Sequence, residues 1–115
     1  MLSTMKILVV DDEFEVRETI KNMLDGTGVE IVPVADAIAA LLALKNNQDV
    51  DAIISDYRLP GLGGSDWIEL VRHYHPTMNL VVITGYEIAR DKIADVVNVL
   101  MKPFTKQQLL AAIGL

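Results

Sequence analysis

Short apolar runs alternate with amphipathic segments along most of the chain. The runs are rich in Val, Ile and Leu and nearly free of charge, which is typical of strands covered on both faces of a parallel sheet. In the second run Pro33 has no amide donor, which favours a strand at the edge of the sheet. The predicted strands are Lys6–Val10, Glu30–Val34, Ala52–Ser55, Leu80–Ile83 and Val96–Met101.

The segments between these runs place apolar residues at helical spacing, which predicts amphipathic helices. A less regular helix is expected over residues 87–94, after the fourth strand. The expected apolar sides are Val16, Ile20, Met23 and Leu24 in the first helix, Ile38, Leu41, Leu42 and Leu44 in the second, Trp67, Ile68, Leu70 and Val71 in the third, and Leu109, Leu110 and Ile113 in the last.

Residues that accept hydrogen bonds from a first helical turn precede several of these helices. We expect Asp36 to cap the second helix, Ser65 or Asp66 the third and Thr105 the last, and Pro76 to end the third. Strand and helix alternate five times without a repeat or a linker. This order predicts one α/β domain over residues 1–115, a five-stranded parallel sheet with helices on both faces.

Composition and charge narrow the function classes. The chain has 115 residues, 51% of them hydrophobic, so a folded domain is expected rather than disorder. It has no cysteine, which excludes disulfides and thiolate chemistry, and a net charge of -6, which argues against direct nucleic-acid binding. No apolar run is long enough for a membrane span and no signal peptide is recognisable, so we expect a cytoplasmic protein without a membrane partner.

Polar residues follow four of the five predicted strands. Asp11 and Asp12 follow the first strand, Asp56 the third, Thr84 the fourth and Lys102 the fifth. Because helical crossovers make all the strands parallel, these strand ends meet at one edge of the sheet. We therefore expect three carboxylates, a hydroxyl and an ammonium group to lie together.

That set of groups suits an anion and a hard cation. Three close carboxylates repel one another, so at least one should have a raised pKa unless a divalent cation is bound. Oxygen ligands without His or Cys favour magnesium. Lys102 and Thr84 then suit the oxygens of a phosphoryl group, toward which Asp56 can act as the nucleophile.

Each residue also has a simpler interpretation. Asp11 and Asp12 could cap the first helix, Asp56 could belong to a turn, Thr84 could bond backbone, and Lys102 could be a solvated charge. Only their joint placement at four strand ends favours a site. His73 and His75, near Pro76, and Trp67 are interpreted as surface and packing residues rather than ligands.

At these residues the chain resembles the receiver domain of two-component response regulators, over essentially its whole length. The motifs that carry the resemblance are Val-Val-Asp11-Asp12-Glu13, Ile-Ser-Asp56-Tyr-Arg-Leu-Pro-Gly, Ile-Thr84-Gly-Tyr and Met-Lys102-Pro103-Phe104. Each motif alone is weak, but all four in this order are specific.

The resemblance implies a flavodoxin-like fold with strand order 2-1-3-4-5. It implies that Asp11 or Asp12, Asp56 and the backbone carbonyl of Arg58 hold Mg²⁺, and that Asp56 takes a phosphoryl group from a histidine kinase or phosphotransfer protein. Lys102 and Thr84 would bind the phosphoryl oxygens, and the peptide bond from Lys102 to Pro103 would be cis.

For the output, the resemblance implies a change on the surface of the fourth helix, fifth strand and fifth helix, which can form a homodimer or bind an effector. The candidate apolar residues there are Ile88, Val97, Val99 and Leu110. In many receivers an aromatic residue stands three positions before the lysine, but here that residue is Val99. An aromatic switch at that position is therefore not expected.

Three alternatives remain at this stage. A small magnesium-dependent phosphatase or phosphotransferase would need a substrate pocket and a general acid, for which so short a chain has no insertion. A flavodoxin-like electron carrier would need a phosphate-binding loop after the first strand, where Asp11, Asp12 and Glu13 would repel phosphate. A receiver that binds partners without phosphorylation would not require the full residue set that is present.

Overall fold

The structure, a computed structural model, describes residues 5–59, 64–85 and 98–115. The loop at 60–63, the helix predicted over 87–94 and the predicted start of the fifth strand therefore lie outside the described residues. The strands are β1 (Lys6–Val10), β2 (Glu30–Val34), β3 (Ala52–Asp56), β4 (Asn79–Thr84) and β5 (Asn98–Met101), and the helices are α1 (Phe14–Leu24), α2 (Ala37–Asn46), α3 (Gly64–Tyr74) and α5 (Lys106–Ile113).

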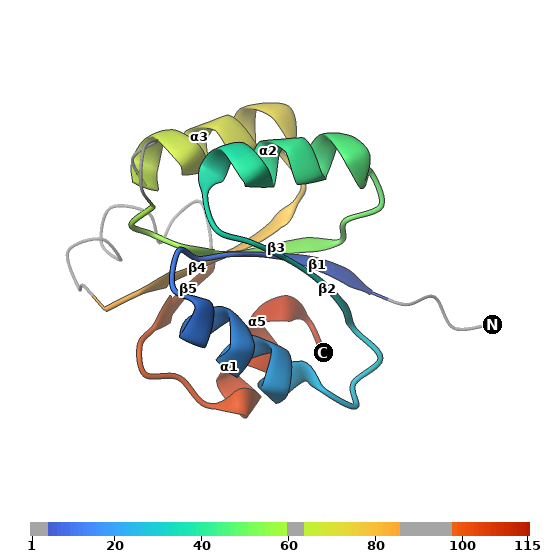
Figure 1. Cartoon of the computed structure of the whole chain (residues 1–115), viewed down its shortest axis with the longest axis vertical. Helices are drawn as coiled ribbons and strands as arrows, with labels where there is room; N and C mark the ends of the chain where they lie inside the picture. Colours follow the sequence, from blue (N-terminus) through green and yellow to red (C-terminus); the bar gives the residue numbers. More distant parts are fainter. Residues whose placement is uncertain (1–4, 60–63, 86–97) are drawn as a thin grey trace.

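The strands form one parallel sheet in the order β2-β1-β3-β4-β5. Helices α2 and α3 cover one face of the sheet, and α1 and α5 cover the other (Figure 1). The predicted α/β class, the flavodoxin-like strand order and the position of β2 at an edge are confirmed. All strands end at one edge because the crossovers return each strand in the same direction.

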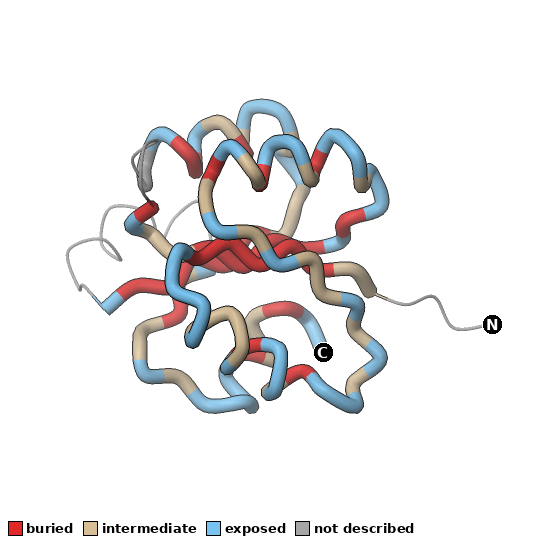
Figure 2. Tube along the Cα trace, in the orientation of Figure 1, coloured by how far each residue is buried: buried red, intermediate tan, exposed pale blue. Residues whose placement is uncertain are grey.

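The two faces of the sheet explain why the central strands are apolar throughout. In β1, Leu8 and Val10 pack toward α2 and α3, while Ile7 and Val9 belong to the cluster under α1 and α5. The same alternation recurs in β3 and β4, so the most buried part of the chain lies in the centre of the sheet (Figure 2). A polar side chain on either face loses its water and needs a partner within the protein, as Ser55 of β3 has in Trp67.

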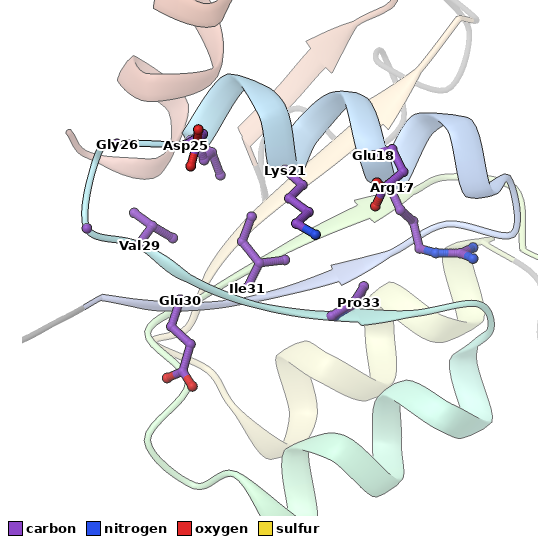
Figure 3. Close-up of a pocket in the computed structure, with 11 residues that line it drawn as sticks. Arg17, Glu18, Lys21, Asp25, Gly26, Val29, Glu30, Ile31 and Pro33 are labelled. Carbon is purple, nitrogen blue, oxygen red and sulfur yellow. The ribbon is translucent and has the colours of Figure 1, made fainter.

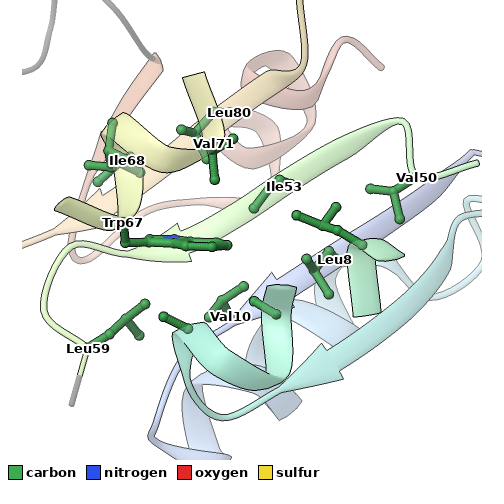
Figure 4. Packing of buried hydrophobic residues seen from close by; sticks show 13 residues of the cluster. Leu8, Val10, Val50, Ile53, Leu59, Trp67, Ile68, Val71 and Leu80 are labelled. Atoms are coloured by element: carbon green, nitrogen blue, oxygen red, sulfur yellow. The ribbon is translucent and has the colours of Figure 1, made fainter. Parts of the chain in front are cut away.

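Trp67 anchors the cluster between α3 and the sheet. Its ring is fully buried among neighbours that include Val10, Ile53 and Leu59 (Figure 4). Its indole Nε1–H donates to the Ser55 hydroxyl at 2.9 Å, and that hydroxyl donates to the carbonyl of Asp56 at 3.0 Å. The predicted packing role of Trp67 is confirmed, and it connects α3 to the end of β3.

Strand β2 lies at the edge of the sheet, and its Pro33 lies on the side where a further strand would pair. The N–H of Glu30 donates to the Met5 carbonyl at 2.8 Å, and the Val34 carbonyl accepts from Asp11 at 3.1 Å, so these residues face the interior of the sheet. Alternate residues of a parallel strand direct their backbone groups to opposite sides, which places Pro33 outward. The missing N–H weakens the open edge as a template for another strand.

The predicted apolar side of α2 is wrong. Leu44 is buried, but Ile38 and Leu42 are exposed, and the other buried residues are Ala37 and Ala40. Because α2 is apolar on nearly every side, periodicity could not identify the inner face. The two alanines are small, and they form the side that packs against β1 and β2.

Two of the three predicted caps are confirmed. The carboxylate of Asp36 accepts from the Ala39 N–H at 2.7 Å, and Thr105 forms a reciprocal capping box with Gln108. The third is wrong because α3 already begins at Gly64, so Ser65 and Asp66 belong to its first turn. An aspartate in that turn still favours the helix through the macrodipole.

Candidate functional site

The sheet brings the predicted site residues together at its carboxyl edge. Backbone hydrogen bonds continue the ladder just past the strands: the N–H of Tyr57 donates to the Ile83 carbonyl, and the N–H of Lys102 donates to the Thr84 carbonyl, both at 2.9 Å. The Tyr57 bond fixes the chain just after Asp56. The Lys102 bond places Thr84 next to the residue that carries the ammonium group.

Three carboxylates form the centre of this site. Asp11, Asp12 and Asp56 each offer a carboxylate oxygen, and these oxygens all lie within 4.8 Å of one another. Asp11 is 1% exposed, the Asp56 side chain is 14% exposed, and Asp12 is open to solvent. The cluster therefore runs from the interior to the surface. Its outer members line a hollow of about 480 Å³ together with Glu13, Arg58, Thr84, Gly85 and Lys102.

Lys102 is the cation that faces these carboxylates. Its Nζ lies 3.7 Å from Asp56 Oδ1 and 3.9 Å from Asp11 Oδ2, distances that allow ion pairing but exceed a direct hydrogen bond. The lysine side chain is 32% exposed. Lys102 and Arg58 supply two positive charges at this edge, against the carboxylates of Asp11, Asp12, Asp56 and Glu13, so the described part of the site keeps an excess of negative charge.

Burial and charge raise the pKa of two carboxyl groups. Burial raises the pKa of Asp11 to about 6, with smaller upward contributions from Asp56 and Asp12, while the Glu13 N–H and Lys102 act in the opposite direction. Burial also raises the pKa of Asp56, against the lowering effects of Lys102 and the Arg58 N–H. The predicted raised pKa is confirmed, although loss of water contributes more to it than repulsion does.

The carboxylate of Asp11 has one satisfied and one unsatisfied oxygen. Oδ1 accepts from the Glu13 N–H at 2.8 Å, whereas Oδ2 is buried without a hydrogen-bond partner among the described residues. Leaving a carboxylate oxygen in this state is costly. The three carboxylates of this cluster supply hard oxygen ligands, which a divalent cation of the magnesium type prefers. The donor set therefore fits such an ion.

The simpler interpretations of these residues can now be compared with their surroundings. Asp11 does not cap α1, because the N-cap is Glu13, whose own side chain makes no capping bond. Thr84 is buried at the end of β4, the position of a strand-end hydroxyl, and it also lines the hollow. His73 is exposed and His75 half-buried, and neither belongs to the cluster of possible metal ligands in the described regions.

Two features of the site were missed at the sequence level. Glu13 lines the hollow, although no separate role was predicted for it. Ser55, the residue before Asp56, accepts from the Trp67 indole and donates to the Asp56 carbonyl, and it thereby links the end of β3 to α3. A serine inside a fully apolar strand was the available signal, because a buried hydroxyl requires a partner.

Two features expected near Lys102, a non-aromatic residue at Val99 and a cis peptide bond to Pro103, can also be located. Val99 is half-buried and packs against the cluster under α2 and α3, so no aromatic ring occupies that position. The peptide bond from Lys102 to Pro103 is cis, as expected.

A larger hollow, of about 620 Å³, lies between α1 and β2 (Figure 3). Its floor includes Ile31 and Pro33, while Arg17, Lys21 and Glu18 supply charges of both signs. These groups do not form a cluster of metal-ligating side chains within the described chain. The reactive groups therefore belong to the smaller hollow at the carboxyl edge.

The fold and the residues at this edge define a class of protein domain: a flavodoxin-like α/β domain with an acidic site suited to a phosphoryl group. Comparison with known proteins agrees. The family model of the response regulator receiver domain matches residues 7–114. The chain is 34% identical over 111 residues to the chemotaxis protein CheY of Pseudomonas aeruginosa, covering 91% of this chain and 90% of that protein.

Two further comparisons give the same result. A CheY homolog of Campylobacter jejuni is 34% identical over 112 residues, covering 91% of this chain and 86% of that protein. A response regulator receiver domain protein from Clostridium thermocellum superposes with a TM-score of 0.86 at 29% identity, covering 96% and 91% of the two chains. The chain belongs to the response regulator receiver domain family of two-component signal transduction.

Membership of this family assigns the general role. Receiver domains are phosphorylatable signalling switches that bind Mg²⁺ at a cluster of aspartates and interact with histidine kinases or phosphotransfer proteins. Among the helices of the described regions, none combines the length and apolar character needed to cross a membrane.

Proposed function

We propose that Asp56 is the phosphoacceptor of this receiver domain and that Mg²⁺ is required for its phosphorylation. The observation that carries the proposal is the convergence of three carboxylates and Lys102 on one hollow at the carboxyl edge of the sheet. Asp56 is the half-buried member of the three, so its carboxylate is held in place and still reachable from solvent.

The transfer is a displacement at phosphorus. A carboxylate oxygen of Asp56 attacks the phosphorus of a phosphohistidine on a histidine kinase or phosphotransfer protein. An O–P bond forms, the N–P bond breaks, and the leaving imidazole nitrogen keeps the electron pair and takes a proton from solvent. The chain catalyses only reactions of its own phosphoryl group, including the later attack of water that releases phosphate.

Asp11 or Asp12, Asp56 and the backbone carbonyl of Arg58 are the proposed ligands of Mg²⁺. When bound, the ion neutralises phosphoryl charge and holds the reacting oxygens in place. The unpartnered Oδ2 of Asp11 supports this assignment, because Lys102 alone does not provide it with a hydrogen bond. The N–H of Arg58, which lowers the pKa of Asp56, orients the acceptor carboxylate.

Lys102 and Thr84 are the proposed contacts of the phosphoryl oxygens. Lys102 lies within ion-pairing distance of Asp56 in the unphosphorylated protein. After transfer, the charge on the phosphoryl group would attract the ammonium group more strongly than the carboxylate does. The lysine and Thr84 line the same hollow as Asp56, which supports a shared ligand.

The proposed output is a change on the surface of segment 87–94, β5 and α5, which would regulate a partner or form a homodimer. Ile88 and Val97 lie outside the described residues, and Val99 and Leu110 are half-buried against the core. We also propose that residues 1–115 act as one receiver domain in the cytoplasm, without direct binding of nucleic acid; the net charge of -6 supports the last point.

The test is phosphorylation by a small phosphodonor, followed by intact-mass measurement. We expect one added phosphoryl group with Mg²⁺, and almost none with EDTA or in Asp56→Asn. Lys102→Met should be labelled at least tenfold more slowly, while Lys106→Met, a change of the same kind at an exposed lysine, should behave like the wild type. Equal labelling with and without Mg²⁺, or unchanged labelling of Asp56→Asn, would contradict the proposal.

A further inference from the structure

Arg17 of α1 donates a hydrogen bond to the main chain at the acidic site. Its Nη1 lies 2.5 Å from the backbone carbonyl oxygen of Asp11. The side chain is half-buried and extends from α1 toward the segment that joins β1 to this helix (Figure 3). A cationic donor makes such a bond stronger than a neutral donor does. The bond therefore ties α1 to the residue with which the acidic cluster begins.

The position of Arg17 near the start of α1 is not one that favours a cation. The helix begins at Phe14, and the N–H of Arg17 makes an early helical bond, to the Glu13 carbonyl at 3.2 Å. The positive end of the helix dipole lies at this terminus, where acidic side chains are preferred over basic ones. The contacts of the guanidinium group therefore explain this arginine better than its place in the helix does.

Phe14 supplies a second contact to the same guanidinium group. The Cζ atom of Arg17 lies 5.7 Å from the centre of the Phe14 ring, a distance typical of a cation–π interaction. A guanidinium group is planar and carries several donors, so it can lie over a ring and still donate to a carbonyl oxygen. The ring thus restrains the group that holds the Asp11 carbonyl.

Asp11 itself has two other hydrogen bonds that keep it in place. Its N–H donates to the Val34 carbonyl at 3.1 Å, and its Oδ1 accepts from the Glu13 N–H at 2.8 Å. Both bonds remain when the side chain of Arg17 is removed. The loss of Arg17 should therefore have its main effect beyond Asp11.

The carboxylate of Asp12 lacks comparable support. It is exposed, and no hydrogen bond from the described part of the chain holds it. Its direction therefore depends on the backbone. The carbonyl of Asp11 and the N–H of Asp12 belong to one planar peptide group, so a bond that fixes this carbonyl also fixes the plane from which Asp12 projects.

We propose that Arg17 is a positioning residue of the magnesium site, which holds the peptide group between Asp11 and Asp12 and thereby keeps the Asp12 carboxylate directed toward Asp56. With this bond in place, oxygens of the three aspartates lie within 4.8 Å of one another. The inference rests on the proposed function, in which Mg²⁺ binds at this cluster. Arg17 acts on the ligands and not on the phosphoryl group.

The charge of Arg17 and its positioning role predict opposite effects on metal binding. A positive charge near the site repels a cation, so removing a residue that acted only by its charge would strengthen binding. A residue that orients a ligand strengthens binding, so its removal weakens binding. The sign of the change therefore separates the two roles.

Binding of the metal alone provides the measurement. The EPR signal of free Mn²⁺ gives the dissociation constant of this ion, which shares the preference of Mg²⁺ for oxygen ligands, and displacement by Mg²⁺ gives the second constant. Arg17→Met should raise both constants about tenfold, the low end for residues that support metal ligands, because the bond reaches the backbone and not a carboxylate. Arg17→Lys keeps the charge without the planar group and should raise them about threefold.

The matched control is Lys21→Met. Lys21 is exposed, lies one turn further along α1, and lines the same larger hollow as Arg17. This variant removes a charge of the same sign from the same helix. It should leave both dissociation constants within about twofold of the wild type, since salt screens an exposed charge at this distance.

A double-mutant cycle tests the route through Asp12. In the Asp12→Asn background the carboxylate that Arg17 directs is gone, so Arg17→Met should raise the constants by less than about twofold. Urea unfolding in EDTA measures any structural role separately. A role confined to stability would lower the urea midpoint of Arg17→Met and leave the metal affinity of the folded variant unchanged.

Unchanged or tighter metal binding by both Arg17→Met and Arg17→Lys would overturn this inference and leave the magnesium site itself intact. Equal weakening by Lys21→Met, or a full effect of Arg17→Met in the Asp12→Asn background, would also overturn it. A wild-type protein that binds neither ion would instead contradict the proposed magnesium site, and this inference would fall with it.

Discussion

Asp11 carries the largest electrostatic cost of any described carboxylate. It is buried, one of its oxygens has no hydrogen-bond partner, and its pKa is raised to about 6. The cause is visible in its position: β1 ends inside the sheet edge, next to Asp56, rather than at the surface. Its burial costs stability, and under the proposed function this cost holds a carboxylate in place for Mg²⁺.

This cost predicts how stability depends on pH without metal. A carboxyl group whose pKa is raised binds its proton more tightly in the folded state, so its charged form destabilises the fold. In EDTA, the contribution of Asp11 to the stability should fall as pH rises from about 4 toward about 6, the interval between the ordinary and the raised pKa. Asp56 contributes in the same direction.

Asp11→Asn removes this charge at constant size. In EDTA at pH 7.5 it should raise the free energy of unfolding by about 1–3 kcal/mol, and the gain should disappear near pH 4. Urea unfolding at several pH values measures both effects, with Asp25→Asn at an exposed position as the control. Adding Mg²⁺ should reverse the order of the two proteins. An Asp11→Asn variant that is less stable than the wild type in EDTA at pH 7.5 would contradict this account.

Ser55 and Trp67 form the second residue-scale feature. In Ser55→Ala the indole Nε1–H stays buried without its acceptor, which should cost about 1–3 kcal/mol. In the Ser55→Ala, Trp67→Phe double variant the unpaired donor is gone, so the two costs should not add. A double-mutant cycle by urea unfolding measures the coupling, expected at about 1 kcal/mol. Strictly additive costs would show that the hydrogen bond contributes nothing.

At the scale of elements, helix caps set by local hydrogen bonds could be predicted from the sequence. A helix face selected by tertiary packing could not. Asp36 and Thr105 could be identified as caps because a side-chain oxygen just before an apolar helical run can accept from the first turn, although the same reasoning placed the start of α3 too late. The inner face of α2 could not be identified, because Leu, Ile and Ala occupy nearly all of its positions and only the approach of the sheet selects Ala37, Ala40 and Leu44.

The capping box of α5 gives an element-scale prediction. Thr105→Ala removes the hydrogen bond that the Gln108 N–H donates to Thr105 Oγ1 at 3.1 Å, and it should cost about 1 kcal/mol. The matched control is Thr19→Ala, since the Thr19 hydroxyl donates within α1 to the Glu15 carbonyl and a mid-helix alanine has the better propensity. Thermal unfolding should rank Thr105→Ala below and Thr19→Ala at or above the wild type. Equal melting temperatures would contradict the capping role.

At the scale of the whole molecule, the topology made the site predictable. Once five parallel strands were expected, Asp11, Asp56, Thr84 and Lys102 had to meet at one edge, because each follows a strand. What could not be predicted was the degree of burial of each carboxylate. It depends on where the chain leaves the sheet: Asp11 still donates its N–H to the Val34 carbonyl of β2 and is buried, whereas Asp12 follows it and is exposed.

The arrangement of the whole sheet also explains why Asp56, the proposed phosphoacceptor, is reachable from solvent. Asp56 stands at the end of a fully buried strand, yet it lines a hollow open to solvent, because the sheet edge itself is not covered by the described helices. A partner can therefore present a phosphohistidine to this edge without unfolding any described element. The proposed function therefore depends on a carboxylate oxygen of Asp56 that accepts the phosphoryl group.

The most direct test is to locate the phosphoryl group. The wild-type protein is incubated with Mg²⁺ and a small phosphodonor, digested, and mapped by mass spectrometry with and without hydroxylamine. The account predicts one hydroxylamine-labile phosphoryl group, on the peptide that contains Asp56, and its absence from Asp56→Asn. A phosphoryl group on any other residue of the wild type, or none at all under conditions that label a known receiver domain, would contradict it.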